Sequence, residues 1–183
     1  MLRSNLGNVL DAQGKHAAAE VEHRAALAAM EASLGPGHPA SAMSRSNLGN
    51  ALDAQGKHAE AEAEHRAALA SREATLGPDH PDVAGSRYSL ATVLLVIDRP
   101  GEALPLAELA WARHQQDDIP PEQHAATAFT LARAQWHNAT GSEDRERARS
   151  LAEVALRKYR AAGDAHRDAA ADVRAWLAEH PGA

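Results

Sequence analysis

The sequence predicts an all-α protein built from stacked helical hairpins, and three observations predict it. The stretch SNLGNVLDAQGKH at residues 4–16 returns at residues 46–58 with one change, Val9 to Ala51. Ala and Leu, the strongest helix formers among apolar residues, dominate the apolar 44% of the chain, while aromatic residues make up 3%. The 42-residue offset between the copies, from Ser4 to Ser46, is typical of solenoids, whose units bury their apolar faces against each other.

Composition excludes several classes of function. The net charge of −6 is spread along the chain, which offers no basic stripe for a nucleic acid backbone. Cysteine is absent, which excludes disulfides, thiolate metal sites and cysteine nucleophiles. The longest apolar run, within LATVLLVI, is far too short to span a membrane, and the start of the chain has no signal-peptide pattern. We therefore expect a cytoplasmic protein with neither nucleic acid nor membrane as a partner.

Each of the two clear copies reads as a pair of helices. In the first copy Leu2, Leu6 and Leu10 recur at helical spacing, and we expect this leucine stripe to pack on the second helix of the pair. The first helix stops near Gly14, and the second runs from about residue 17 to 34. The segments GPGHP and GPDHP then break the second helix, and their last proline suits the first turn of the next helix.

The rest of the chain carries weaker copies. A third begins at Arg87, although Asp98 replaces the turn glycine, and a fourth is interrupted by NATGSEDRE, after which Ser142 is the expected N-cap of its second helix. A last helix begins at Asp164 and carries Trp176 and Leu177, which we expect to cover the final repeat. The expected organisation is one array over 1–183, with repeats at about 1–42, 43–84, 85–124 and 125–163 and a capping helix at 164–180.

Small and large residues recur at the same places in both copies, namely Leu6, Gly7, Leu10, Gly14, Ala19, Ala26 and Leu27, and Leu48, Gly49, Leu52, Gly56, Ala61, Ala68 and Leu69. This pattern resembles the tetratricopeptide repeat, and the 42-residue length with its LGPDHP loop resembles the kinesin-light-chain subtype. This resemblance implies a right-handed superhelical solenoid of antiparallel helix pairs. It also implies a non-enzymatic scaffold that binds a peptide or protein through a concave groove.

The degenerate third and fourth copies also resemble the C-terminal arrays of bacterial serine/threonine protein kinases. The chain carries no glycine-rich phosphate loop and no HRD or DFG motif. The resemblance therefore implies a regulatory module of a bacterial signalling protein, present here as a fragment without the kinase.

The repeated polar residues of the first helices are the candidate ligand-binding groups. Asn5 and Asn47 lie where related arrays place asparagines that hydrogen-bond a peptide backbone, since an amide both donates and accepts. The full set of expected groove residues is Asn5, Asn8, Asp11, Asn47, Asn50, Asp53, Tyr88, Ser89 and Thr92. The alternative is that these are solvated residues inherited with the duplication.

The third copy departs from this polar pattern, because Leu95, Val96 and Ile97 replace polar or small residues. The groove should turn apolar there, either as an interaction site or because these residues pack against the rest of the array. Phe129 is a further groove candidate on the same basis.

The spacing of the histidines would also allow a metal site. His16, Glu20 and His23 have a spacing that suits metal ligands on one helix face, and the second copy repeats it. The same positions hold packing aromatics in the repeat pattern, so we expect these histidines to fill the seam between helices. His38 and His80 should serve turn geometry. No HExxH, nucleophile-elbow or Walker sequence occurs, so we expect no catalytic, cofactor or metal site.

A different class of function is self-assembly. An array that exposes Leu2, Leu6 and Leu10 at its end could stack on another copy, which would give a monomer in equilibrium with a weak homo-oligomer. The sequence does not name the partner.

Overall fold

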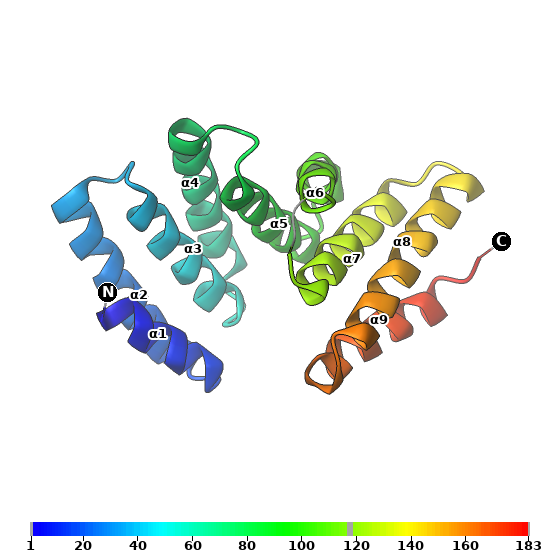
Figure 1. The fold of residues 1–183 in the computed structure, drawn as a ribbon, viewed down its shortest axis with the longest axis horizontal. Coiled ribbons are helices and arrows are strands. Elements are labelled where there is room, and N and C mark those ends of the chain that lie inside the picture. Colours follow the sequence, from blue (N-terminus) through cyan, green and yellow to red (C-terminus); the bar gives the residue numbers. More distant parts are fainter. Residues whose placement is uncertain (1, 117–118, 183) are drawn as a thin grey trace. The chain divides into compact units, whose positions relative to one another are not determined.

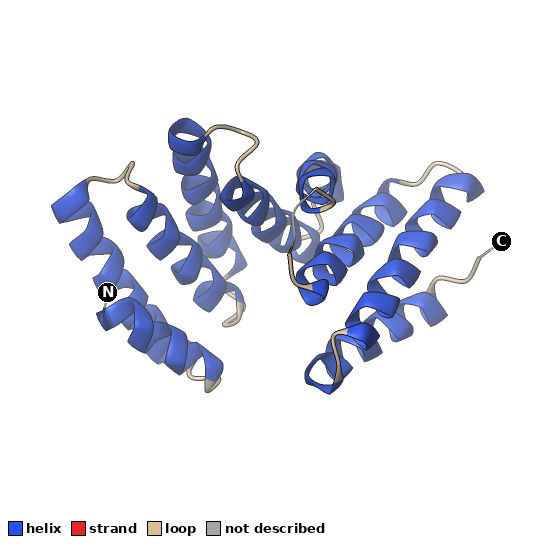
Figure 2. Cartoon of the chain, in the orientation of Figure 1, coloured by secondary structure: helices blue, strands red, loops and turns tan. Residues whose placement is uncertain are grey.

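The computed structural model describes residues 2–116 and 119–182, and within these ranges every regular element is a helix (Figures 1 and 2). The predicted all-α class of consecutive helix pairs is thereby confirmed. The chain divides into two compact units, the first ending at Ile97 and the second beginning at Asp98. None of the described helices combines the length and the apolarity that crossing a membrane requires.

The first unit holds two complete hairpins and one further helix. Its elements are α1 (Leu2–Ala12), α2 (His16–Leu34), α3 (Pro39–Asp53), α4 (His58–Leu76) and α5 (Pro81–Val96). Each helix packs against the next one along the chain (Figure 1). The repeated sequence therefore folds into the same hairpin twice, α1–α2 and α3–α4.

The loops between hairpins are built identically in the two copies. Gly35 and Gly77 adopt φ of +88° and +82°, a left-handed conformation that favours glycine, and each ends the preceding helix. His38 and His80 then accept a hydrogen bond through Nδ1 from the backbone N–H two residues on, at 3.1 Å in both cases. The expected turn role of these two histidines is confirmed, because their imidazoles act as N-caps of α3 and α5.

The second unit ends in a short helix that follows a tight turn. Its elements are α6 (Pro100–His114), α7 (Pro121–Asn138), α8 (Ser142–Ala161), a 3₁₀ turn (Asp164–His166) and α9 (Arg167–Glu179). The capping helix therefore begins three residues later than the sequence predicts. Ser142 is the first residue of α8 and not its N-cap, and the turn before α8 is held instead by Asp144, whose Oδ2 accepts from N and Oγ1 of Thr140.

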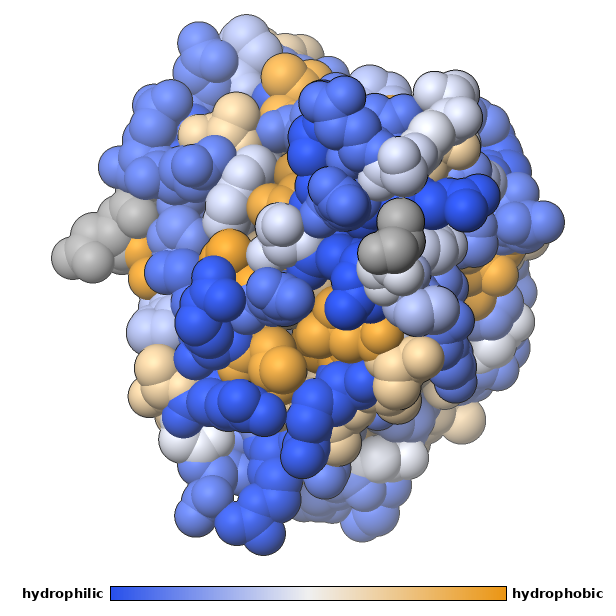
Figure 3. Space-filling view, turned by 90° about the vertical axis from the view of Figure 1, so that its right-hand side faces the viewer, coloured by the Kyte–Doolittle hydropathy of each residue, from blue (hydrophilic) through white to orange (hydrophobic). Residues whose placement is uncertain are grey.

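The capping role predicted for the last helix is confirmed. Trp176 is buried in a cluster with Tyr159 of α8 and alanines of α7 and α8, and Leu177 packs against that cluster. The Trp176 ring meets Trp136 and Phe129 edge-on at centroid distances of 5.6 and 5.8 Å. Seen from the side of Figure 1 on which α8 and α9 lie, the surface is mostly hydrophilic around a smaller apolar area (Figure 3).

The prediction that the leucine stripe of the first helix packs on its own partner helix is wrong for Leu2 and Leu6 of α1, which are 89% and 48% exposed. The equivalent of Leu6 in α3, Leu48, is 1% exposed and lies in a cluster with Leu27 of α2 and Ala61 of α4. This position therefore contacts the preceding hairpin as well as the partner helix, and among the described residues no preceding hairpin covers Leu6.

The capping helix should contribute measurably to the free energy of unfolding. We expect Trp176→Ala to lower the free energy of unfolding by about 3–5 kcal/mol, because it empties a buried aromatic site. The matched control is Leu109→Ala on α6, whose half-exposed side chain should cost far less. Urea denaturation of both variants measures the difference, and equal losses would mean that α9 does not close the core.

Candidate functional site

A buried imidazole lying on a glycine joins the two helices of each hairpin in the first unit. His23 and His65 are buried, and a Cβ added to Gly7 or Gly49 would lie 2.4 or 2.7 Å from Cε1 of the facing histidine. Only glycine leaves room for the ring at this distance. The histidines therefore fill the seam between helices, as the repeat pattern predicts.

The aspartates at the ends of α1 and α3 bind histidines of the helix that follows. Oδ1 of Asp11 lies 3.0 Å from Nδ1 of His16, and its Oδ2 lies 3.0 Å from Nε2 of His23. In the second copy Oδ1 of Asp53 lies 2.7 Å from Nδ1 of His58. Both predicted groove aspartates thus have partners inside their own hairpin, which fix the turn between its helices.

The environment of His65 keeps its imidazole neutral. Burial lowers the pKa of His65 to about 4, with Asp53 opposing the shift and Arg72 adding to it. Its Nδ1 is buried and has no hydrogen-bond partner among the described residues. A neutral ring is what this tight seam accommodates.

Arginines join neighbouring hairpins within the first unit. Arg45 of α3 donates to Glu31 of α2 and to Glu64 of α4, the latter at 2.8 Å. Arg87 of α5 repeats the first of these contacts and donates to Glu73 of α4 at 2.7 Å. These charge-assisted bonds tie successive hairpins together.

An amide and a lysine add a second link between the first two hairpins. Nε2 of Gln55 donates to the His16 carbonyl at 3.3 Å and to Oε2 of Glu20 at 2.9 Å. Lys57 donates to the same carboxylate oxygen at 2.7 Å, and this bond is the main reason why the pKa of Glu20 falls to about 2. The start of α2 is therefore held against the turn that follows α3.

Four of the predicted site residues come together at one place. A hollow of about 300 Å³ lies between α1 and α3. Its lining is Asn8, Asp11, His16, Asn47, Asn50 and Ala54. Nδ2 of Asn47 donates to Oδ1 of Asn8 at 3.3 Å, which leaves the Asn8 amino group and the Asn47 carbonyl for other partners. Asn5, exposed on α1, and Asp53 are outside this lining.

The third copy presents a different surface on α5. Tyr88, Ser89 and Thr92 are partly exposed there, and Oγ1 of Thr92 donates to the Tyr88 carbonyl at 3.0 Å. Leu95 is buried, so it does not contribute to an exposed apolar stretch, whereas Val96 is about half exposed. The predicted change from polar to apolar therefore holds at Val96 and not at Leu95.

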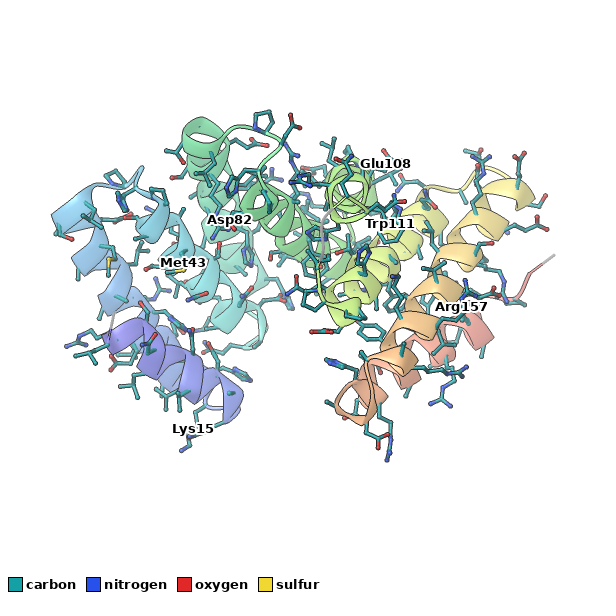
Figure 4. The ribbon with its side chains drawn as sticks, viewed as in Figure 1. Lys15, Met43, Asp82, Glu108, Trp111 and Arg157 are labelled. Atoms are coloured by element: carbon teal, nitrogen blue, oxygen red, sulfur yellow. The ribbon has the colours of Figure 1, made fainter. Side chains whose placement is uncertain are left out.

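The structure places Phe129 in the packing role that was the alternative to a groove position, and it exposes Met43, a residue that the sequence did not indicate. Phe129 packs against the core of the second unit at the ring of Trp176. Met43, labelled in Figure 4, is about half exposed and lies one turn before Asn47 on α3. The spacing of Met43, Asn47, Asn50 and Ala54 along one helix face was the signal that sequence reasoning missed.

Among residues 2–116 and 119–182, no three histidine or carboxylate side chains lie close enough together to hold a metal ion. The potential ligands of the first copy have other partners instead, since His16 and His23 both bond Asp11 and Glu20 accepts from Lys57 and Gln55.

Comparison with known proteins agrees with the geometry. A family model for the tetratricopeptide repeat matches residues 1–74 and 46–116. No curated protein sequence is significantly similar to the chain. Among solved structures, BtubC (BKLC) from P. vanneervenii superposes with a TM-score of 0.74 at 20% identity, over 87% of this chain and 62% of that one. The chain thus spans less than two thirds of BtubC.

A second similar fold comes from a fungal protein. Nearly identical TPR-like repeats from a candidate kinesin light chain of Podosopora anserina superpose with a TM-score of 0.71 at 21% identity. That match covers 97% of this chain and 88% of the other. A form of the same repeats with a glutamine-to-methionine substitution gives a TM-score of 0.71 at 23% identity, over 97% and 93% of the two chains. At such identities the likeness concerns the fold.

The need for glycine against the buried histidine can be tested by replacing glycine with alanine at two different positions. We expect Gly49→Ala to destabilise the protein by about 1–3 kcal/mol, because the new methyl group overpacks against His65. Gly85→Ala on α5, where a Cβ would meet nothing within 4 Å, should instead stabilise by roughly 0.5–1 kcal/mol. Thermal denaturation of the two variants measures the change in melting temperature. Changes of the same sign would contradict the close contact between Gly49 and His65.

Acid should weaken the protein through His65. As pH falls from its ordinary pKa of 6.5 to the folded value of about 4, the unfolded chain binds a proton that the folded chain does not. The free energy of unfolding should therefore decrease over this window, by up to about 3 kcal/mol. Urea titrations at several pH values should show a flatter pH dependence for His65→Gln than for the wild type, and identical slopes would rule out this residue as the cause.

Proposed function

The chain belongs to the tetratricopeptide repeat family, and from this premise we propose that it is a non-enzymatic scaffold that binds an extended peptide segment of a partner protein. Repeats of this family generally mediate protein–protein interaction. The proposed binding surface is the hollow between α1 and α3 together with the exposed side chains of α5 next to it in the first unit. We further propose that binding serves a bacterial signalling protein in the cytoplasm.

The single observation that carries the proposal is the pairing of two amides from adjacent repeats at the floor of a hollow. After bonding each other, Asn8 keeps both N–H donors of its amide and Asn47 keeps its amide oxygen for other partners. An extended peptide backbone offers one N–H and one C=O per residue, so it complements both free groups. Asn50, in the same lining, adds a third amide.

The neighbouring side chains indicate which peptides would fit. Asp11 is already bonded to two imidazoles, so its oxygens have fewer lone pairs left for the ligand. Met43 and Val96 are exposed on α3 and α5, on the helices that carry the proposed surface. The preferred ligand is therefore an extended segment with a polar stretch followed by an apolar side chain.

The experiment selects the ligand first and then tests the site. A library of random peptides displayed on phage is enriched on the immobilised wild-type chain, and the best peptide is measured by fluorescence anisotropy. Asn8→Ala combined with Asn47→Ala should weaken its binding about five- to a hundred-fold, because each neutral hydrogen bond contributes about 0.5–1.5 kcal/mol. The fold should survive, since both amides are lost together.

The control removes two amides elsewhere. Gln116 and Gln123 are exposed in the second unit, and changing both to Ala should leave the affinity unchanged. A library from which no peptide is enriched would argue against peptide binding. If a selected peptide binds the double asparagine variant as tightly as the wild type, the binding site lies outside the hollow.

A further inference from the structure

The second hairpin carries an arginine where the first carries a methionine. The two copies are nearly identical in their second helices, but the position that holds Met30 in α2 holds Arg72 in α4. Arg72 lies two turns after His65 and is only partly exposed. The second hairpin therefore places a positive charge where the first has an uncharged side chain of similar length.

The Arg72 guanidinium is bonded by neutral hydroxyl groups. Its Nη1 donates to Oγ of Ser46 on α3 at 3.1 Å and to Oγ of Ser86 on α5 at 2.5 Å. Ser86 is buried, and its hydroxyl donates in turn to the Asp82 carbonyl at 3.1 Å. Nε and Nη2 of Arg72 have no hydrogen-bond partner among the described residues, so one edge of the guanidinium is unused.

The lack of a bonded carboxylate distinguishes Arg72 from the other arginines described in the first unit. Their carboxylate pairs are Arg3 with Glu22, Arg24 with Glu20, Arg45 with Glu31, Arg66 with Glu62 and Arg87 with Glu73. Asp82, labelled in Figure 4, acts on Arg72 through its charge, but its exposed side chain makes no described hydrogen bond to the guanidinium. Arg72 has thus lost part of its hydration without gaining a bonded anion.

The Arg72 side chain keeps its charge although it is partly buried. Burial lowers the pKa of Arg72, and the negative charge of Asp82 opposes this shift. An arginine nevertheless stays protonated in proteins, because its pKa lies far above neutral pH. The unused edge carries the N–H groups of Nε and Nη2, whose parallel arrangement matches the two oxygens of a carboxylate.

The guanidinium lies between the two helices that carry most of the proposed binding surface. Its partners Ser46 and Ser86 belong to α3 and α5, and they are the sequence neighbours of Asn47 and Gly85. Gly85 is the equivalent of Met43, so α5 has no side chain where α3 has a half-exposed methionine. A Cβ added to Gly85 would meet no atom within 4 Å, so the space beside it is open to a ligand.

We propose that Arg72 is a specificity-determining residue that makes this surface select peptides with an aspartate or glutamate side chain. The carboxylate enters between α3 and α5 and accepts from Nε and Nη2 of Arg72, while Nη1 stays bonded to the two serines. The inference rests on the proposed peptide binding and adds the chemistry of one ligand residue to it. The first hairpin, with Met30 at the equivalent place, makes no such selection.

Parallel selections test this inference. One phage library of random peptides is enriched on the immobilised wild-type chain and on Arg72→Met, which introduces the residue that the first hairpin already accommodates. The peptides are fused to the coat protein through their C-termini, so a selected carboxylate belongs to a side chain. We expect aspartate or glutamate to be enriched at one peptide position on the wild type and not on Arg72→Met. Arg72→Gln is a second neutral variant, in case methionine disturbs the packing.

The best wild-type peptide then measures the size of the effect. Its synthetic form, amidated at the C-terminus, should bind Arg72→Met about ten- to a hundredfold more weakly than the wild type, because charge-assisted hydrogen bonds are lost. Replacing its acidic residue by the corresponding amide should cause a similar loss on the wild type and little further loss on Arg72→Met. Arg66→Met removes the same charge from an exposed position of α4 and should leave the affinity nearly unchanged.

Three results would overturn this inference while peptide binding itself stands. These are selected peptides without an acidic preference, an acidic preference that Arg72→Met and Arg72→Gln leave unchanged, and an equal loss of affinity with Arg66→Met. A library from which neither the wild type nor the variants enrich a peptide would instead contradict the proposed function and this inference with it. The double asparagine variant should still prefer acidic peptides, so the hollow and Arg72 are tested separately.

Discussion

The contact between an imidazole ring and a glycine backbone sets the geometry of the first unit. Because His23 and His65 lie directly on Gly7 and Gly49, the two helices of each hairpin approach as closely as one flat ring allows. In the first hairpin that approach also brings Oδ2 of Asp11, at the end of the first helix, within 3.0 Å of Nε2 of His23. The turn, the spacing of the helices and the position of the polar groups at the helix ends all follow from this one contact.

Much of this arrangement could be predicted from the sequence, because the information is local or repeated. The helix bounds follow from Gly14, from the GPGHP and GPDHP loops and from the spacing of alanine and leucine. The seam histidines follow from their place in the repeat. The leucine stripe was assigned to the partner helix alone because one helix cannot reveal whether an apolar face also meets the preceding hairpin. Only the difference between Leu6 and Leu48 in the structure separates these cases.

The sequence predicted which types of residue line the hollow, but not how these residues contact each other. Asn8, Asp11, Asn47 and Asn50 do line one hollow, but the bond between Asn8 and Asn47 depends on how α1 and α3 approach each other, which no local pattern specifies. The hydrogen bonds that link neighbouring hairpins could not be predicted for the same reason. Gln55 bonds the His16 carbonyl in the first unit, and Asn138 bonds the Pro100 carbonyl at 3.0 Å in the second, so two different residues form one kind of link.

The seam also constrains how these repeats can diverge. In the fourth copy the positions of the glycine and the histidine are taken by Ala132 and Ala152, which are both buried in the core of the second unit. Two alanines thus replace one glycine and one large residue. A lineage that moves from one solution to the other by single substitutions must pass through a hairpin with alanine against histidine, which clashes, or with glycine against alanine, which leaves a void. The two positions are therefore expected to evolve as a pair.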